Sequence, residues 1–419
     1  MIEVPGAAGP RDPSPVDDGD DRIPVTLLTG FLGAGKTTLL NRLIKQPAMA
    51  GTAVLINEFG AVAIDHHLVE SVDETMLVLD SGCVCCTVQG DLVKALALLH
   101  ERLARREIPQ IRRVVIETTG LADPLPVIST LMEERFVRAR YRCDSVLTVV
   151  DASLGAGQLD RHREAVRQVA AADRLLITKR DLADRTGSER LDARLQALNP
   201  GAVRLAVSHG EIDPALLFGA GIYSAAGKHP DIAAWLGEEA RRGGHARPPA
   251  GDGDASRHED GVGSFAIHFD RPVPWRGFAV AMGRILTDHA SRLLRIKGLM
   301  NVAGLATPLV VQCVGGIAYP PVRLPRWPRQ GRRFDMRGRL VFIADGLSAE
   351  QMADIRARLA ALADDAAATR AAATTPLLPT RCWLGERLPS LGRDGFETEG
   401  WFVRPVHHAA RRTAPAAHA

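Results

Sequence analysis

Residues 30–37 read Gly-Phe-Leu-Gly-Ala-Gly-Lys-Thr, which follows the pattern G-x-x-x-x-G-K-T. The stretch lies between an apolar run at Val25–Leu28 and a helical pattern at Lys36–Ile44. A loop of this kind between a strand and a helix is typical of proteins that bind a nucleoside triphosphate. Its glycines let successive backbone N–H groups turn toward a phosphate without Cβ clashes, and the helix N-terminus adds partial positive charge. The stretch therefore predicts a phosphate-binding loop.

The side chains at the end of this loop predict how the phosphates are held. Lys36 can reach the oxygens of the β- and γ-phosphates, and the hydroxyl of Thr37 can ligate Mg²⁺. We expect both residues to take part in catalysis. The nucleotide contacts that we predict along the loop come from Gly30, Gly33, Ala34, Gly35, Lys36, Thr37 and Thr38.

An acidic residue, Glu117, follows a second apolar strand at Val114–Ile116. Ligands of open α/β sheets bind outside the carboxyl ends of the strands, so Glu117 is predicted to lie near the phosphate-binding loop. We expect Glu117 to hold Mg²⁺ through a water and to take part in catalysis. The backbone of Gly120 is expected to contact the γ-phosphate. The alternative is that Glu117 is an exposed acid at a strand end.

Residues 178–181 read Thr-Lys-Arg-Asp at the end of the apolar run Leu175–Ile177. The carboxylate of Asp181 can accept hydrogen bonds from N1–H and from the exocyclic amine of guanine, whereas adenine offers no such pair of donors. The stem of Lys179 can cover the base. The pattern indicates a guanine site formed by Thr178, Lys179 and Asp181, with Thr178 where the usual signature N-K-x-D has Asn. An ordinary turn with a solvated charge pair is the alternative.

Three cysteines lie within four positions, in the stretch Gly82-Cys83-Val84-Cys85-Cys86. Thiolates this close repel one another unless they are protonated or bound to a metal, and soft thiolates favour Zn²⁺ or Cu(I). The C-x-C-C spacing supplies three ligands, whereas a closed structural zinc site has four. The open position could take water, another donor or a receiving protein, which suits transfer of a metal. A redox pair and inert cysteines are the alternatives.

Short apolar runs alternate with helical patterns between residues 23 and 236. Such runs are typical of a parallel sheet covered by helices on both faces. The predicted strands are Val25–Leu28, Ala53–Ile56, Met76–Leu79, Val114–Ile116, Val146–Val150 and Leu175–Ile177. The predicted helices are Lys36–Ile44, Asp91–Arg106, Pro124–Arg135, Arg161–Ala172 and Ser188–Leu198. Residues 23–236 are therefore predicted to form an α/β domain, a P-loop NTPase with a mostly parallel sheet.

Residues 263–365 carry several short strand patterns and few helices, which predicts a smaller C-terminal α+β domain. One helix is expected from about Trp275, and the last strand is expected at Leu340–Ile343. Ser348 and Gln351 can form a capping box, so the last helix of the chain is predicted to begin at Ser348.

Three other segments have the composition of linkers and tails. Residues 1–22 are acidic and rich in Pro and Gly, which predicts a disordered lead-in. Residues 237–262 combine Gly-Gly, Pro-Pro and Gly-Asp-Gly-Asp, which predicts a flexible linker. Residues 366–419 are predicted to form a mostly irregular tail.

Composition and charge exclude several classes of protein. Among the 419 residues, 52 Lys and Arg against 49 Asp and Glu leave a net charge of +3, which gives no broad footprint for nucleic acid. The uncharged stretch Leu299–Val322 is interrupted by Gly, Pro and polar residues, so we expect a strand–turn–strand unit there rather than a membrane span. We see no secretory signal, and six cysteines are too few for a disulfide scaffold. These features predict a cytoplasmic protein that contacts neither nucleic acid nor a membrane.

Several motifs together resemble those of the CobW-type metal-handling GTPases, relatives of the HypB and UreG nickel-insertion GTPases. In chain order they are the run from Ile23 to Asn41, Asn57-Glu58-Phe59-Gly60 with Ile64-Asp65, the stretch 82–86, the stretch 117–124, and Lys179-x-Asp181. Residues 294–298 and 340–343 also resemble the C-terminal domain of that family. The resemblance covers about residues 23–365.

The resemblance implies a GTPase that binds GTP with Mg²⁺ and delivers a metal, usually zinc, to client metalloproteins. It implies that Cys83, Cys85 and Cys86 bind Zn²⁺. The sequence does not identify the client, and it leaves open whether the chain forms homo-oligomers. Because no arginine finger is evident, we expect slow intrinsic turnover of GTP.

The same resemblance places Glu58 in a mobile switch, the segment Asn57–Gly60. We expect Glu58 to orient the attacking water or to lend a carboxylate to the metal, and a solvated loop acid is the alternative. His66 and His67 follow the switch, and either could be a fourth metal ligand or a surface histidine.

Other functions stay open at this point. A cobalt-handling GTPase of cobalamin or nitrile hydratase maturation fits as well, because C-x-C-C thiolates accept both metals. A P-loop phosphotransferase with incidental cysteines would need a basic lid, for which the sequence shows no candidate. A zinc store without enzymatic activity would leave the phosphate-binding loop unexplained.

Overall fold

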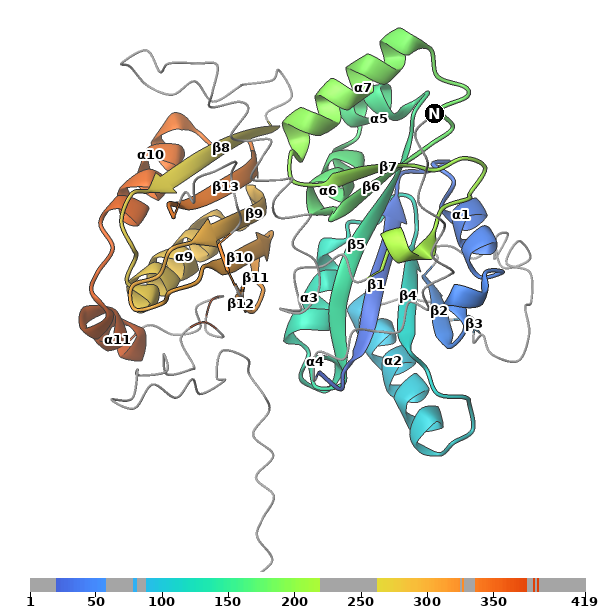
Figure 1. Cartoon of the computed structure of the whole chain (residues 1–419), viewed down its shortest axis with the longest axis horizontal. Coiled ribbons are helices and arrows are strands. Elements are labelled where there is room, and N and C mark those ends of the chain that lie inside the picture. Colours follow the sequence, from blue (N-terminus) through green and yellow to red (C-terminus); the bar gives the residue numbers. More distant parts are fainter. Residues whose placement is uncertain are drawn as a thin grey trace, which may run out of the picture.

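The N-terminal part of the chain folds around one parallel sheet (Figure 1). The computed structural model describes residues 20–57, 78–80, 88–218, 262–324, 326–327, 336–374, 380 and 383. Within this described part, seven strands pair in the order β3-β2-β4-β1-β5-β6-β7, and all neighbours are parallel. The strands are β1 Ile23–Gly30, β2 Thr52–Asn57, β3 Val78–Asp80, β4 Arg113–Thr118, β5 Tyr141–Asp151, β6 Arg174–Thr178 and β7 Val203–Ala206. The prediction of a mostly parallel sheet is confirmed.

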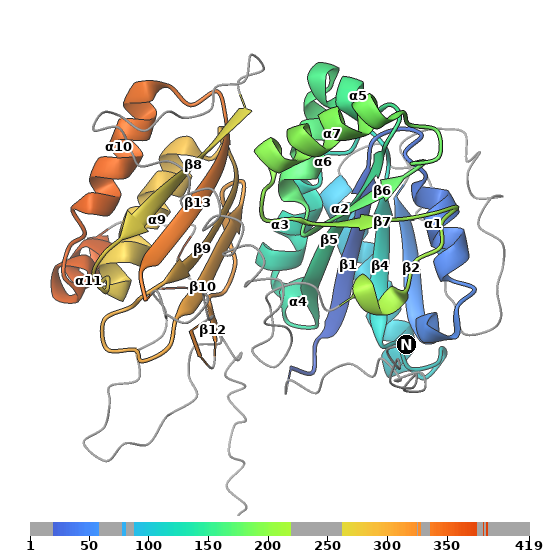
Figure 2. The same cartoon turned by 45° about the horizontal axis from the view of Figure 1, so that its top comes forward.

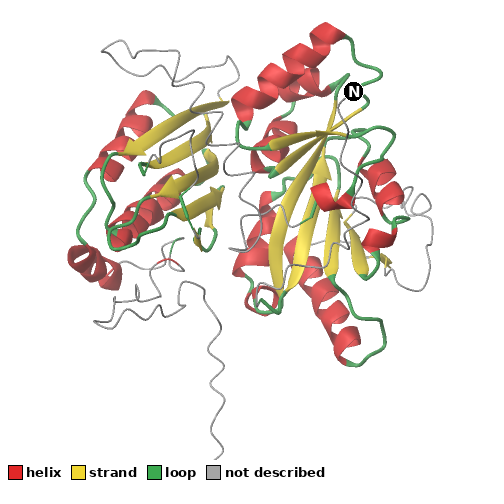
Figure 3. Ribbon diagram, viewed as in Figure 1, coloured by secondary structure: helices red, strands yellow, loops and turns green. Residues whose placement is uncertain are grey.

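Helices cover both faces of this sheet (Figure 3). They are α1 Lys36–Leu43, α2 Val88–Ala104, α3 Leu125–Glu133, α4 Arg135–Arg138, α5 Gly155–Arg161, α6 Arg163–Ala171 and α7 Arg185–Leu198. Alternate residues of β1 enter different cores: Val25 and Leu27 pack with α2 and α3, whereas Leu28 packs with α1. Because successive side chains of a strand point to opposite faces, an apolar run buries both faces at once.

The sequence patterns missed the elements that carry little apolar signal. Each predicted strand overlaps an observed one, although only part of Met76–Leu79 is described. Strand β7 was not predicted, since it is an edge strand with half-exposed side chains. Helices α4 and α5 were also not predicted, because both are short.

The C-terminal unit is built on an antiparallel sheet with the order β11-β10-β9-β13-β8, and β12 pairs with β10. Its strands are β8 Val262–Phe269, β9 Leu293–Met300, β10 Leu309–Val314, β11 Ile317–Ala318, β12 Val322–Arg323 and β13 Gly338–Asp345. Helices α9 Trp275–His289 and α10 Ala349–Ala360 pack on one face, and the opposite face turns toward the N-terminal unit (Figure 2). The predicted α+β domain is confirmed.

The uncharged stretch Leu299–Val322 runs through strands β9, β10 and β11 and ends at β12, as the strand–turn–strand prediction requires. Among the helices that the structure describes, none has both the length and the apolar character that a membrane span needs.

The capping box at the start of α10 is confirmed, but α10 is not the last helix. The backbone N–H of Gln351 donates to the Ser348 hydroxyl at 3.1 Å, and the backbone N–H of Ser348 donates to the Gln351 side chain at 2.9 Å. A further helix, α11 Asp365–Thr374, extends into the segment predicted to be mostly irregular. Alanine is the strongest helix former, and Asp364 accepts from the N–H of Ala367 at 2.7 Å, which favours a helix there.

A residue of the predicted tail belongs to the C-terminal core. Trp383 is 2% exposed and lies beside Trp275 and Phe278. Its indole N–H donates to the carbonyl of Tyr319 at 2.6 Å, and its own carbonyl accepts from the indole of Trp275 at 3.0 Å. The predicted domain bounds stay predictions, but the buried indole places residue 383 within the C-terminal unit.

We predict that Trp383→Ala destabilises the C-terminal unit by about 3–5 kcal/mol, because it leaves a cavity and removes the indole hydrogen bond to the carbonyl of Tyr319. The control is Met336→Ala in the same unit, where the side chain is 49% exposed and a change within about 0.5 kcal/mol is expected. Urea unfolding of the full chain measures both. Equal free energies of unfolding for the two variants would contradict the assignment of Trp383 to the core.

Candidate functional site

The predicted nucleotide ligands meet at the carboxyl edge of the N-terminal sheet. Because β1, β4, β5 and β6 are parallel, the chain leaves all four strands at the same edge. The loop after β1 is the phosphate-binding loop, and Gly120 follows β4. Thr178 ends β6, and Lys179 and Asp181 follow it.

The phosphate-binding loop is fixed by close contact with β5. Gly30 has φ 145°, and a Cβ atom there would lie 2.4 Å from the carbonyl oxygen of Val149, so this position requires glycine. Helix α1 begins at Lys36 with Gly35 at its N-cap, φ 98°. Since glycine has no side chain to cap the helix, the first N–H groups of α1 are suited to a phosphate. The loop therefore fits the predicted ligand, with Gly33 and Ala34 in its turn.

The structure brings three predicted phosphate and magnesium ligands together. The ammonium of Lys36 donates to the carbonyls of Gly30 and Phe31, at 2.9 and 3.3 Å, so it already lies within the loop. The hydroxyl of Thr37 donates to Oε1 of Glu117 at 3.0 Å. A hydroxyl beside a carboxylate is a hard oxygen pair that suits Mg²⁺. Glu117 is buried, so it is not the exposed acid that was the alternative.

The loop after β4 packs directly on the phosphate-binding loop. A Cβ atom at Gly120 would lie 2.6–2.8 Å from atoms of Leu32, so only glycine allows this approach. The hydroxyls of Thr118 and Thr29 form a hydrogen bond of 2.8 Å that ties β4 to β1. Gly120 is therefore held beside the phosphate-binding loop, where a γ-phosphate contact was predicted.

Two of the three predicted guanine residues contact the same loop. The hydroxyl of Thr178 donates to the carbonyl of Ala34 at 2.7 Å, and Nζ of Lys179 donates to the carbonyl of Gly33 at 2.7 Å. Thr178, which replaces the usual Asn, thus keeps a side-chain link between β6 and the loop. Asp181 is exposed in the turn after β6, where its carboxylate is accessible to a base.

One member of this site, Asp151 at the end of β5, was not predicted from the sequence. Its carboxylate is 1% exposed, pairs with Nζ of Lys179 at 2.8 Å and accepts from the backbone N–H groups of Ser153 and Leu154, at 2.8 and 3.1 Å. Burial alone would raise the pKa of Asp151, but the hydrogen bonds from Lys179 and Ser153 outweigh it and lower the pKa. The position of Asp151 directly after the apolar run Val146–Val150 was the signal available, the same signal that indicated Glu117.

The predicted metal and switch residues lie outside the described residues. These are Glu58, His66, His67, Cys83, Cys85 and Cys86. Among the residues that are described, no group of three His, Cys, Asp or Glu side chains is arranged to hold a metal. Two of the isolated cysteines, Cys143 and Cys313, are buried packing residues as predicted, and Cys382 is not described.

Strand β3, which precedes the cysteines in the sequence, is described and ends close to Glu117. Strand β3 ends at Asp80, and Ile56 of β2 pairs with both Asp80 and Glu117. With strands about 4.8 Å apart, the backbone at Asp80 lies about 10 Å from the backbone at Glu117. Strand β3 therefore ends at the edge where Thr37 and Glu117 meet.

We predict that Asp151→Asn lowers the free energy of unfolding by about 1–3 kcal/mol at pH 7, because an amide replaces a charge that Lys179 pairs with. The pKa of Asp151 in the folded chain lies below its ordinary value of 3.8, so its stabilisation is present above that value and is lost as the pH falls through the lower, folded-state pKa. Urea unfolding at a series of pH values tests this. The stability difference between wild type and variant should shrink below about pH 4, and a difference that stays constant in acid would contradict the assignment.

Comparison with known proteins places this site in a family. Residues 24–205 match the family described as CobW/HypB/UreG, nucleotide-binding domain, and residues 262–362 match the cobalamin synthesis protein cobW C-terminal domain. The chain is 36% identical to the zinc chaperone YjiA of Escherichia coli over 292 residues, which is 70% of this chain and 86% of the relative. It is 29% identical to the zinc chaperone CobW of a Sinorhizobium species over 323 residues, again 70% and 86% of the two chains.

A solved structure supports the same grouping. The Zn(II)-bound YjiA GTPase from Escherichia coli matches with a TM-score of 0.58 and 30% identity, over 82% of this chain and 100% of that one. The phosphate-binding loop, the acid of β4 and the two matched regions thus agree with one another. The chain belongs to the CobW/HypB/UreG family.

Proposed function

We propose that this chain is a GTP-hydrolysing metallochaperone that binds zinc through Cys83, Cys85 and Cys86 and passes it to client metalloproteins under the control of bound nucleotide. The observation that carries the proposal is the register of β2 with β3 and β4, which ends β3 at the same sheet edge as Glu117. The cysteines follow β3 in the sequence. The relatives named zinc chaperone and zinc-regulated GTPase metalloprotein activator support the same class of function.

The described residues supply the groups that we assign to GTP and to its Mg²⁺. Lys36 offsets the negative charge that develops on the β- and γ-phosphates, and Thr37 and Glu117 would hold Mg²⁺. When bound, Mg²⁺ supplies further positive charge to the phosphate oxygens. The N–H of Gly120 contacts the γ-phosphate. In the reaction, water adds to the γ-phosphorus and the bond to the bridging oxygen breaks, which leaves GDP and phosphate; we assign the orientation of that water to Glu58.

Selection of guanine follows from the loop after β6. Asp181 accepts from N1–H and from the exocyclic amine of the base, and Lys179 covers the base. Lys179 is held in place from both sides, by the carbonyl of Gly33 and by the buried carboxylate of Asp151. Adenine has neither N1–H nor an amine at C2, so ATP binding would leave this carboxylate without the pair of donors that guanine offers.

Zinc is the metal that the chain delivers, and the presence or absence of the γ-phosphate controls its binding and release. Cys83, Cys85 and Cys86 provide three soft ligands, and the fourth position is left for a donor that can be exchanged for one of the client. Gain or loss of the γ-phosphate shifts segments that contact it, as in other GTPases. Cobalt would use the same thiolates, so metal analysis of the purified protein decides between the two metals.

We predict that Asp181→Asn weakens GTP binding by about ten- to a hundredfold, since the amide cannot accept both guanine donors. Xanthosine triphosphate has a carbonyl in place of the exocyclic amine, so the variant should bind it better than wild type does. Calorimetry with both nucleotides measures this, with Asp192→Asn on the exposed side of α7 as the control. Unchanged GTP affinity in the Asp181 variant would exclude the guanine contact.

We predict that replacing Cys83, Cys85 and Cys86 together by Ser abolishes zinc binding and leaves basal GTP hydrolysis within about twofold, because these thiolates touch the metal and not the phosphates. The control Cys143→Ala removes a buried packing thiol and should keep the zinc. Zinc content by mass spectrometry and phosphate release measure the two effects. A triple variant that still carries one zinc per chain would refute the metal assignment.

A further inference from the structure

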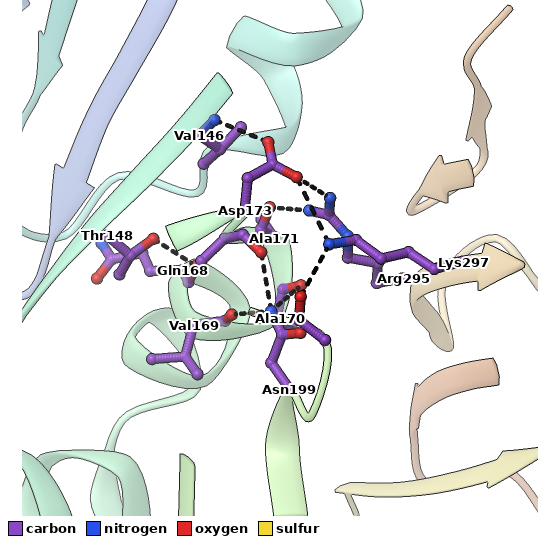
Figure 4. A network of polar contacts seen from close by, with 12 residues as sticks. Val146, Thr148, Gln168, Val169, Ala170, Ala171, Asp173, Asn199, Arg295 and Lys297 are labelled. Carbon is purple, nitrogen blue, oxygen red and sulfur yellow. Dashed lines mark hydrogen bonds and ion pairs between the residues drawn. The ribbon is translucent and has the colours of Figure 1, made fainter. Parts of the chain in front are cut away.

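A buried guanidinium of the C-terminal unit binds the end of helix α6 (Figure 4). Arg295 of β9 is 1% exposed, donates to the carbonyl of Ala171 at the last turn of α6, and forms an ion pair with Asp173. Nζ of Lys297 lies 3.6 Å from the same carboxylate. The second oxygen of Asp173 accepts from the backbone N–H of Val146 at 2.9 Å. One carboxylate thus joins β9, α6 and β5, and the cations lie at the negative end of the helix.

The C-terminal unit also contacts α6 at its start and along its side. Nη2 of Arg163, the first residue of α6, lies 2.5 Å from Oδ2 of Asp345 in β13. Apolar residues of β8, β9 and β13 share one buried cluster with residues of α6, and they are Val262, Leu294, Ile343, Ala165, Val166 and Val169. The helix is therefore held along its whole length by the other unit.

The same helix holds the loop that contains Gly120. The side-chain amide of Gln168, which is fully buried in α6, donates to the carbonyls of Gly120 and Ala122, both at 3.0 Å. Arg167 pairs with Asp123 at 2.6 Å in the same loop. A shift of α6 must move these partners or break the hydrogen bonds. Water cannot replace the hydrogen bonds of the buried Gln168 amide unless the core opens.

The helix also reaches the phosphate-binding loop at its N-terminal end. The ring of His162, the N-cap of α6, stacks on the ring of Phe31 with the centroids 4.6 Å apart. Helix α6 thus contacts both loops that surround the phosphates, at the residue after Gly30 and at Gly120.

We propose that Gln168 and Arg295 are positioning residues for the γ-phosphate. Through α6, the position of the Gly120 loop depends on the position of the C-terminal unit relative to that helix. The inference rests on the proposed contact between Gly120 and the γ-phosphate. Since GDP lacks that phosphate, a displaced Gly120 loop weakens the binding of GTP more than the binding of GDP. A protein that binds the C-terminal unit and loosens Arg295 would then change the preference for GTP over GDP from a distance.

The test compares affinities for a non-hydrolysable GTP analogue and for GDP in the full chain. We expect Gln168→Met to lower the affinity for the analogue about tenfold and Arg295→Met to lower it about threefold. The affinity for GDP should change less than twofold in both variants. The double variant should bind the analogue no more weakly than Gln168→Met alone, because both changes interrupt the same chain of contacts from the C-terminal unit through α6 to the Gly120 loop. The control is Arg358→Met, which removes ion pairs with Asp288 and Asp354 inside the C-terminal unit and should change neither affinity.

Arg295→Lys keeps the test valid if Arg295→Met does not unfold cooperatively on heating. The lysine retains the charge beside Asp173 but cannot also bond the carbonyl of Ala171. We therefore again expect a lower affinity for the GTP analogue and an unchanged affinity for GDP. Equal losses for GTP analogue and GDP, or additive losses in the double variant, would overturn the inference. If wild type itself does not bind the GTP analogue, the proposed function fails as well, which separates the two outcomes.

Discussion

The parallel register of β1 between β4 and β5 is the constraint on which the site depends. Gly30 leaves β1 so close to Val149 of β5 that no side chain fits, and the loop that follows is turned into the helix that starts at Lys36. The same register brings Glu117 beside Thr37. One sheet edge thus brings together the phosphate loop with Thr37, Glu117 from 80 positions further along the chain, and the end of β3 at Asp80.

The second organising element is α6, which is shared by both units. Its side chains reach Phe31 and the Gly120 loop on one side, and Arg295 with Asp345 hold it from the other. A buried ion pair between units is costly to break, because separation leaves charges without partners in an apolar setting. The C-terminal unit therefore contacts the helix that holds the Gly120 loop.

The sequence predicted those features that depend on local patterns. The apolar runs gave the central strands, and the motif at residues 30–37 gave the loop between β1 and α1. Strand β7 and helix α11 were not predicted. Strand β7 is a half-exposed edge strand, and α11 lies in a segment whose composition predicted an irregular tail. The pair Arg295–Asp173 could not be predicted, because its members are 122 positions apart and only the packing of two units brings them together.

The central claim is that the γ-phosphate and the metal influence each other through this shared edge. The direct test is the zinc affinity of the full chain, measured by competition with a chelator, with a GTP analogue bound and with GDP bound. The account predicts affinities that differ by at least about fivefold, and zinc must change the affinity for the analogue relative to GDP by the same factor. Identical zinc affinities in the two nucleotide states would contradict it.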